Sequence, residues 1–281
     1  MNKVMDLGSK YQSRFLEIAQ EGFERELVFA CFANLETPGP LCFNNFAYAF
    51  RELLRHIFHR LAPSDSVKKC DWYRPDITSR DGITRAQRAK FLIQGGLSDY
   101  YVKEKLNIDI ELAISELKET YEHLNNFTHI QASTFNLGNS QVEKLAEQCL
   151  ESGRLLLEGI AECRMNVICC LEEDIDNHLI NNAISETFNE IDELATHHIV
   201  EAVYVDSCEI LEIGPKELRL LAEGDLEVVL QYGSSSDVRN DIGETMNESF
   251  PFSSELHIDF KRPLGKYAKV KNFQVDTSSW F

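Results

Sequence analysis

The stretch NNFAYAFRELLRHIFHRLAP, residues 44–63, decides the fold of the N-terminal half. Its apolar residues recur every three or four positions, at Phe46, Phe50, Leu53, Leu54, Ile57, Phe58 and Leu61. That period is typical of one face of an α-helix. Asn44 or Asn45 can cap the first turn, and Pro63 cannot continue the helix. The stretch therefore predicts a long amphipathic helix in a helical core.

The same period predicts further helices on both sides of this stretch. We expect them at 9–35, 84–94, 98–106, 108–130, 140–175 and 178–195. Thr84 and Ser98 are suitable caps for two of them. The stretch 64–82 is mainly polar, with Pro75, Gly82 and aromatic Trp72 and Tyr73, so we expect a loop packed by its own aromatics.

After residue 198 the pattern changes to β-branched residues with partial alternation, which is typical of strands. The strands are expected in IVEAVYVDSCEILEI, ELRLLAE, DLEVVLQY, ELHIDF and KVKNFQV, with turns at GPK and EGD and a polar insertion at 233–252. The prediction is an α+β protein. A helical domain over 1–175 is followed by a smaller, mainly antiparallel β domain over 176–281, which includes a linking helix.

The net charge of −18 is unevenly distributed. Residues 1–165 have a net charge of −3 and residues 166–281 one of −15, whereas the segment 51–90 has a net charge of +5. Because acidic surfaces repel phosphates, nucleic acid contact is expected in the N-terminal half. The longest uncharged apolar run, Leu27 to Ala33, is too short to cross a membrane. The first residues also lack the apolar segment of a secretion signal, so a cytoplasmic protein is expected.

Two short motifs contain an arginine or a histidine that suits phosphate chemistry. Arg51 and His56 form an R-x4-H pair; five positions apart, they do not share one helix face but can flank a groove. The alternative is a solvated helix face. In NNFTH, Asn125 and His129 end a predicted helix, whose dipole favours a protonated imidazole and suits it to acid–base work. The alternative there is an ordinary helix cap.

A basic cluster surrounds Trp72 and Tyr73 in the same half. Its candidate nucleic-acid-binding residues are Arg55, Arg80, Arg85, Arg88 and Lys90. Arginine beside aromatic rings can grip phosphates and stack bases of a single strand. The alternative is a solvated charged surface.

The acidic half offers carboxylates that a Mg²⁺-dependent nuclease would need, at Asp206, Glu227, Asp237, Asp241, Glu244 and Asp259. With so many acids, a chance match to a loose pattern such as Asp259-Phe260-Lys261 is expected. No metal ligand is therefore assigned. Adjacent His197 and His198 favour a helix-to-strand junction, and GSSSD at 233–237 lacks the lysine of a phosphate-binding loop.

Taken together, the ordered segments carry a resemblance. An arginine in RELL on an early helix and an Asn-x-x-x-His that ends a later one resemble the HEPN superfamily of helical bundles. The whole set is more closely similar to the bacterial pPIWI-associating nuclease domain family, from about residue 42 onward. Its segments are FAYAFRELLRHIFHRLAP, CDWY, TRAQRAKFLIQGGLSD, LNNFTHI, ECR, LATHH, LQYGSSSD, SFPF and DTSSW.

The resemblance implies a defence nuclease encoded near prokaryotic Argonaute-like genes, with RNA favoured over DNA. It implies metal-free cleavage in which Arg51 clamps the phosphate, His129 is the acid–base group and Asn125 orients it. His56 matches the R-x4-H motif, but on an early helix rather than the late one of active HEPN enzymes. No cofactor is expected, with Mg²⁺ needed only if the β domain is catalytic. Expected partners are nucleic acid, a second copy in a homodimer and an Argonaute-like protein. The alternative is a non-catalytic dimerising module whose β domain binds a ligand, a nucleic acid or a protein.

Overall fold

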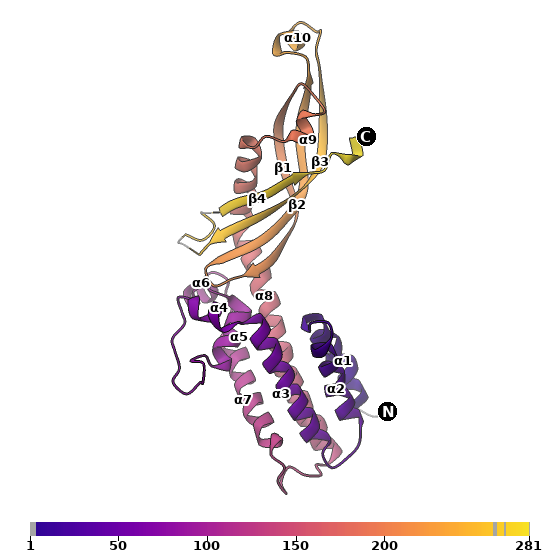
Figure 1. Cartoon of the computed structure of the whole chain (residues 1–281), viewed down its shortest axis with the longest axis vertical. Helices are drawn as coiled ribbons and strands as arrows, with labels where there is room; N and C mark the ends of the chain where they lie inside the picture. Colours follow the sequence, from indigo (N-terminus) through magenta and orange to yellow (C-terminus); the bar gives the residue numbers. More distant parts are fainter. Residues whose placement is uncertain (1–3, 261–262, 267, 281) are drawn as a thin grey trace. The chain divides into compact units, whose positions relative to one another are not determined.

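The computed structural model describes residues 4–260, 263–266 and 268–280. The chain divides into two compact units, Met1–Cys163 and Arg164–Phe281. The first is helical and the second is built on an antiparallel sheet, so the predicted α+β class is confirmed (Figure 1). The division falls inside a long helix, whereas the sequence placed the domain boundary at 175/176.

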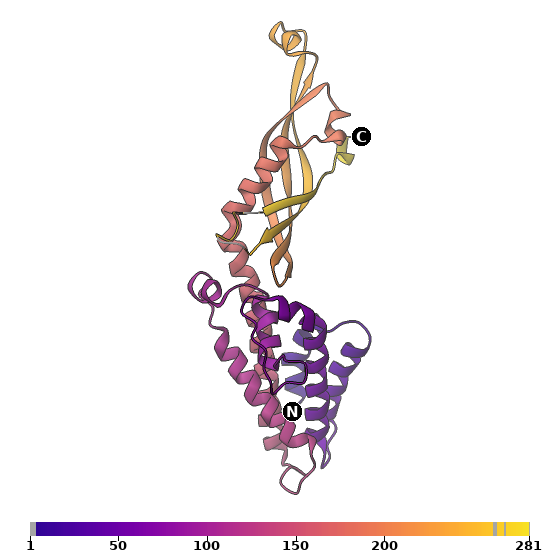
Figure 2. The same ribbon diagram turned by 60° about the vertical axis from the view of Figure 1, so that its left-hand side comes forward.

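Seven helices and the first part of an eighth form the helical unit over the described residues (Figures 1 and 2). They are α1 (Val4–Ile18), α2 (Phe23–Glu36), α3 (Cys42–Leu61), α4 (Ser64–Lys69), α5 (Arg85–Gln94), α6 (Asp99–Glu104), α7 (Ile110–Thr128) and α8 (Asn139–Ser185). The predicted helix in residues 44–63 is α3, and it packs against both α2 and α7.

The apolar face of α3 is the centre of the core. Phe46, Phe50, Leu53 and Ile57 are each at most 3% exposed. Phe50 meets Phe15 of α1 edge to face, with ring centroids 5.4 Å apart. Burying such side chains stabilises the fold by about 1.5–3 kcal/mol each. The sequence period therefore located the core correctly.

The single helix predicted over 9–35 is wrong, because the chain breaks between α1 and α2. Gly22 has a φ of +87°, a conformation that residues with a Cβ rarely adopt. Glu24 accepts a hydrogen bond from the Gln20 amide at 2.9 Å and pairs with Arg60 of α3 at 2.7 Å. These contacts fix the break and tie α2 to the end of α3.

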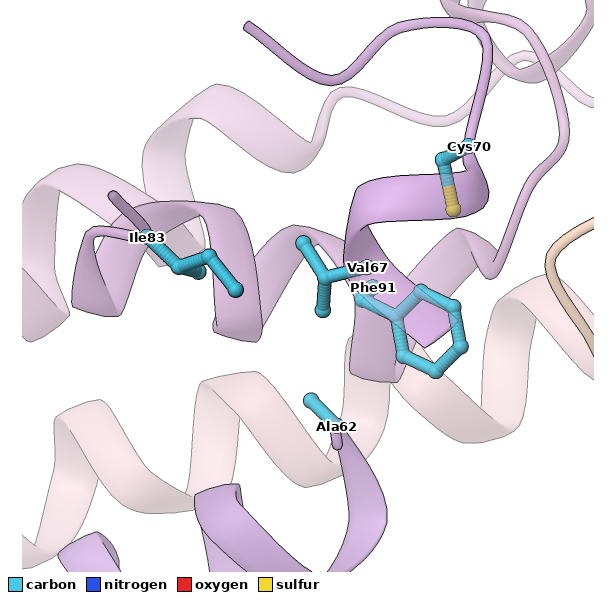
Figure 3. Close-up of a cluster of buried hydrophobic side chains, with 5 residues drawn as sticks. All are labelled: Ala62, Val67, Cys70, Ile83 and Phe91. Carbon is cyan, nitrogen blue, oxygen red and sulfur yellow. The ribbon is translucent and has the colours of Figure 1, made fainter. Parts of the chain in front are cut away.

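The segment 62–91 has a small core of its own, in which Val67 and Cys70 lie near Phe91 (Figure 3). The buried members are Ala62, Val67, Cys70, Ile83 and Phe91. Trp72 and Tyr73 pack against them, as the sequence predicted for this loop. Its first part was mispredicted, since residues 64–69 form α4. Thr84 starts α5 with a capping box shared with Gln87, which confirms the predicted cap.

Predicted helices at 140–175 and 178–195 are in fact one helix, α8, followed by the short α9 (Asn189–Asp192). Every fourth residue from Cys163 through Val167, Leu171, Ile175 and Leu179 is buried. Residues 160–196 contain neither glycine nor proline. Nothing local ends the helix there, so the predicted gap does not occur.

The second unit contains a four-stranded antiparallel sheet in the order β1-β2-β3-β4. The strands are β1 (His197–Ile213), β2 (Glu217–Tyr232), β3 (Glu244–Asp259) and β4 (Ala268–Val275), with α10 (Ser235–Arg239) before β3 and a 3-10 turn η1 (Ser278–Trp280) after β4. The predicted antiparallel arrangement is confirmed. The insertion predicted over 233–252 is shorter, because β3 already begins at residue 244.

A turn predicted at EGD, residues 223–225, does not form, and β2 continues through it. Here β1 has an irregularity between Val205 and Ser207. A Cβ on Gly224 would lie 1.9 Å from the Tyr204 carbonyl oxygen, so a residue with a side chain would collide with β1. Glycine here permits close strand approach rather than a turn.

The C-terminal part of α8 lies along one face of the sheet within this unit (Figures 1 and 2). Arg164 donates to the Ile210 carbonyl at 2.6 Å, and His178 Nε2 donates to the Gly265 carbonyl at 2.7 Å. That sheet face is apolar, with Leu218, Leu220 and Leu226 fully buried. No helix in the described part of the chain combines the length and apolar character that a membrane crossing requires.

Candidate nucleic-acid interface

A cleft of about 1100 Å³ opens in the helical unit between α3, α5, α7 and the segment 76–84. Five of its lining residues are permanent cations: Arg55, Arg80, Arg85, Arg88 and Lys118. Three are acidic: Asp76, Asp81 and Glu122. We call it the cationic cleft. Four of the five predicted nucleic-acid-binding residues line it, although they are up to 33 positions apart in sequence.

One face of α7 forms a wall of the cationic cleft. Leu117, Lys118, Tyr121, Glu122 and Asn125 all line it. Their spacing of three or four residues places them in one row along a helix. Leu117 and Tyr121 are buried toward the core, whereas Lys118 and Glu122 are exposed. The row therefore combines an apolar base with a charged rim.

The structure brings Arg51 and Asn125 together beside this cleft. Arg51 Nη1 donates to Asn125 Oδ1 at 3.1 Å, across 74 positions of sequence. Arg51 Nη2 also donates to Glu52 at 3.1 Å, and Arg55 Nε donates to the same carboxylate at 2.7 Å. Burial raises the pKa of Glu52, but the two guanidinium groups outweigh it and lower the pKa overall. One carboxylate thus holds two arginines.

Tyr121 lies under this group of charges. The ring is 4% exposed, and the Arg85 guanidinium lies over it, 4.6 Å from the centroid. Its hydroxyl is buried without a hydrogen-bond partner among the described residues. Burial raises the pKa of Tyr121, although Arg85 and Arg51 oppose this. The phenol therefore stays neutral, and its ring supports Arg85.

Arg88 has a different environment from its neighbours, because it is 3% exposed. Its guanidinium donates to Asp81 at 2.6 Å, to Ser64 at 2.9 Å and to the Ala62 carbonyl. Burial raises the pKa of Asp81, but hydrogen bonds from the Ile83 amide, Ser79 and Ser64 and the Arg88 charge bring it to about 2. Arg88 therefore fastens the segment 64–83 to α3.

The other basic candidates differ in their availability. Arg80 and Arg85 are exposed within the cleft. Arg55 is exposed but pairs with Glu52. Lys90 lies outside the cleft lining, where it pairs with Asp99 at 2.6 Å and lies 4.8 Å from the centre of the Trp72 ring. Arg80 and Arg85 are thus the predicted residues whose charge is most open to a ligand.

The two predicted histidines do not line the cleft. His129 is exposed at the residue that ends α7, one turn beyond Asn125. His56 faces the other way, with its ring 5.0 Å from Phe23 and its Nε2 3.0 Å from Arg55. The structure therefore unites Arg51 with Asn125 and leaves His56 apart from them.

His59, Lys118 and Tyr121 line the cleft but were missed in the sequence. Burial lowers the pKa of His59, and the Arg88 and Arg55 charges lower it further, while Asp81 opposes them. His59 follows Arg55 by four positions, a spacing that places both residues on the same face of α3. Lys118 and Tyr121 share the helical row that ends at Asn125.

The acidic half does not assemble its carboxylates. Within the described residues, no three His, Cys, Asp or Glu side chains form a group suited to a metal ion. Lys261 of the Asp259-Phe260-Lys261 pattern lies outside those residues. His198 pairs with Asp192 at 2.8 Å at the start of β1, which matches the expected helix-to-strand junction. Ser234 of GSSSD caps α10.

The fold and the cleft define a two-unit α+β protein with a cation-lined cleft in its helical unit. Two family models match the chain, over residues 16–153 and 160–281, and both are described as "Predicted pPIWI-associating nuclease". The chain belongs to the predicted pPIWI-associating nucleases, which confirms the resemblance found in the sequence. No curated protein and no solved structure was found to match it.

Proposed function

We propose that this chain cuts single-stranded RNA at the cationic cleft, with Arg51, Asn125 and a histidine and without a metal ion. The observation that supports this most is the 3.1 Å contact between Arg51 and Asn125 at the cleft edge. This contact holds the Arg51 guanidinium beside the cationic cleft. Such a group can bind a phosphate through two parallel hydrogen bonds.

The chemistry follows from the charges that develop at phosphorus. In RNA the 2′-hydroxyl is an internal nucleophile, so a base that takes its proton starts the cleavage. The 2′-oxygen then bonds to phosphorus, the bond to the 5′-oxygen breaks, and that oxygen receives a proton. Arg51 stabilises the negative charge on the phosphorane oxygens. Asn125 is a positioning residue that fixes the guanidinium.

The proton is carried by an imidazole of the helical unit. His129 is the candidate that the sequence supplies, at the residue that ends α7. His59 is the candidate that the cleft adds. Replacement of the working histidine by alanine should slow cleavage by about 100-fold or more. His123 of α7, exposed and outside the cleft lining, is the matched control. Unchanged rates in both His59→Ala and His129→Ala would refute an imidazole mechanism.

The central experiment compares an end-labelled RNA strand with a DNA strand of the same sequence, in the presence of EDTA. We expect the full chain to cut the RNA and leave a 2′,3′-cyclic phosphate, and to leave the DNA intact. Arg51→Ala should cut about 100-fold more slowly, whereas Arg14→Ala should keep the wild-type rate, because Arg14 is a 63% exposed side chain on α1. Cleavage that needs added Mg²⁺ would contradict the proposal. Binding without cleavage in any condition would favour the binding-module alternative.

The family name implies association with pPIWI systems. We propose that the chain acts beside an Argonaute-like partner and as a homodimer. Co-purification with such a partner, and light scattering of the purified chain, test these two assemblies separately. A monomeric mass at all concentrations would remove the homodimer.

A further inference from the structure

Arg85 and Tyr121 form a stacked pair in the cationic cleft, and its exposed member is the Arg85 guanidinium rather than the ring beneath it. Tyr121 is 4% exposed, so a base has no access to the ring. Arg85 covers the ring at 4.6 Å and is itself exposed toward the cleft. The cation–π contact orients the guanidinium without using up its charge.

Arg85 also differs in its partners from Arg51, Arg55 and Arg88. Glu52 holds Arg51 and Arg55, and Asp81 holds Arg88. No carboxylate is paired with Arg85 within the described part of the chain. A flat, charged group that is fixed in place and left unpaired is a surface suited to a ligand.

The backbone beneath Arg85 is fixed before any ligand arrives. Arg85 is the first residue of α5 and lies between Thr84 and Gln87, which form the capping box of this helix. Ile83, two positions earlier, is 3% exposed in the small core of Figure 3. Since this start of α5 is already ordered, binding there costs little conformational entropy.

We propose that Arg85, held against Tyr121, is a stacking site for one nucleobase of a single strand in the cationic cleft. The inference rests on the proposed function, because it names how that substrate is held. Every base has a π-face that stacks on a guanidinium plane, so the site tolerates any sequence. Bases in a duplex are already stacked on each other, so the site selects single strands. The exposed cations Arg80 and Lys118 remain for the phosphates.

The test separates a planar contact from a charge contact. Arg85→Lys keeps the positive charge but removes the plane, and Arg14→Lys, at an exposed side chain of α1 outside the cleft lining, is the matched control. The probe is a short single-stranded DNA that carries 2-aminopurine at each position in turn, since it lacks the 2′-hydroxyl needed for cleavage. Thermal unfolding of each variant shows that it is folded.

We expect the wild type and Arg14→Lys to quench 2-aminopurine at one position of the probe. Arg85→Lys should lose this quenching and bind about tenfold more weakly. An abasic site at that position should weaken binding to the wild type but not to Arg85→Lys. Arg85→Lys that binds and quenches like the wild type would show a phosphate contact and overturn the inference, as would a wild type that binds no single strand. Because the probe is not cut, Arg85-dependent quenching without any RNase activity would refute the proposed cleavage and leave the stacking site standing.

Discussion

The cationic cleft and the sheet unit use charge in opposite ways. In the sheet, Arg219 of β2 pairs with Glu255 of β3 at 2.8 Å, and His257 lies 3.1 Å from the same carboxylate. In the cleft, Arg80 and Arg85 are exposed and have no acidic partner within the described residues. In the acidic half, with its net −15 over residues 166–281, Arg219 and His257 thus lie beside a carboxylate, whereas Arg80 and Arg85 of the cleft do not in the described part of the chain. The comparison shows that local pairing, and not total charge, marks the candidate site.

The largest difference is expected when a buried cation and an exposed one are removed. Arg88→Ala leaves the Ala62 carbonyl without its donor and Asp81 without its countercharge, so it should lower the free energy of unfolding by about 2–4 kcal/mol. Arg219→Ala in the sheet should cost at most about 1 kcal/mol, because its side chain is 38% exposed. Urea denaturation followed by circular dichroism measures both. Equal losses of unfolding free energy in the two variants would mean that Arg88 does not hold the segment 64–83 against α3.

The second prediction concerns the pair that we place in the chemistry. Arg51→Ala and Asn125→Ala should each slow RNA cleavage by about 100-fold, because the first removes the guanidinium and the second removes the hydrogen bond that positions it. The double variant should be no slower than the worse single one, since both changes remove the same unit. Arg219→Ala and Glu255→Ala, a comparable pair in the sheet, should leave the rate unchanged. Rates that multiply in the Arg51/Asn125 double variant would show that the two residues act independently.

A smaller effect is expected on the salt dependence of RNA binding. Arg80→Ala should lower the slope of log affinity against log salt by about 0.7, the value for one phosphate contact on a single strand. Lys269→Ala, an exposed cation on β4, should leave the slope unchanged. Filter binding at several salt concentrations measures both. A slope that falls in both variants would place the strand on the sheet as well.

The parts of the fold that were predicted correctly depend on local sequence. The period of α3 and the caps at Thr84 and Ser98 need no distant contact. The wrong predictions concern positions where the same residue type is compatible with two different structures. Gly22 interrupts a helix through its positive φ, whereas Gly224 continues a strand because β1 approaches it closely. The same residue type therefore breaks one element and preserves another.

The sequence predicted those residues of the candidate site that a short motif marks. Arg51 and Asn125 were placed in one site from the resemblance, and their side chains are in contact. His59 could not be assigned to the site from the sequence, because the cleft that it lines forms only when the segment 76–84 folds against α3 and α7. That fold depends on the small core around Val67 and on Arg88, which are tertiary contacts.

The smallest effect follows from the carboxylate that anchors Arg88. The pKa of Asp81 lies at about 2 in the folded chain, below its usual 3.8, so the unfolded chain binds the proton more tightly. Asp81 therefore stabilises the fold above pH 3.8, and this contribution is lost as the pH falls toward 2. Its side chain is 38% exposed, so solvent screening limits the contribution to about 1 kcal/mol. Asp81→Asn should melt lower than the wild type at neutral pH, and the two melting temperatures should converge in acid. A gap that stays constant would mean that the Asp81 charge does not stabilise this side of the cleft, and that its hydrogen bonds to Ser64 and the Ile83 amide hold the segment in either protonation state.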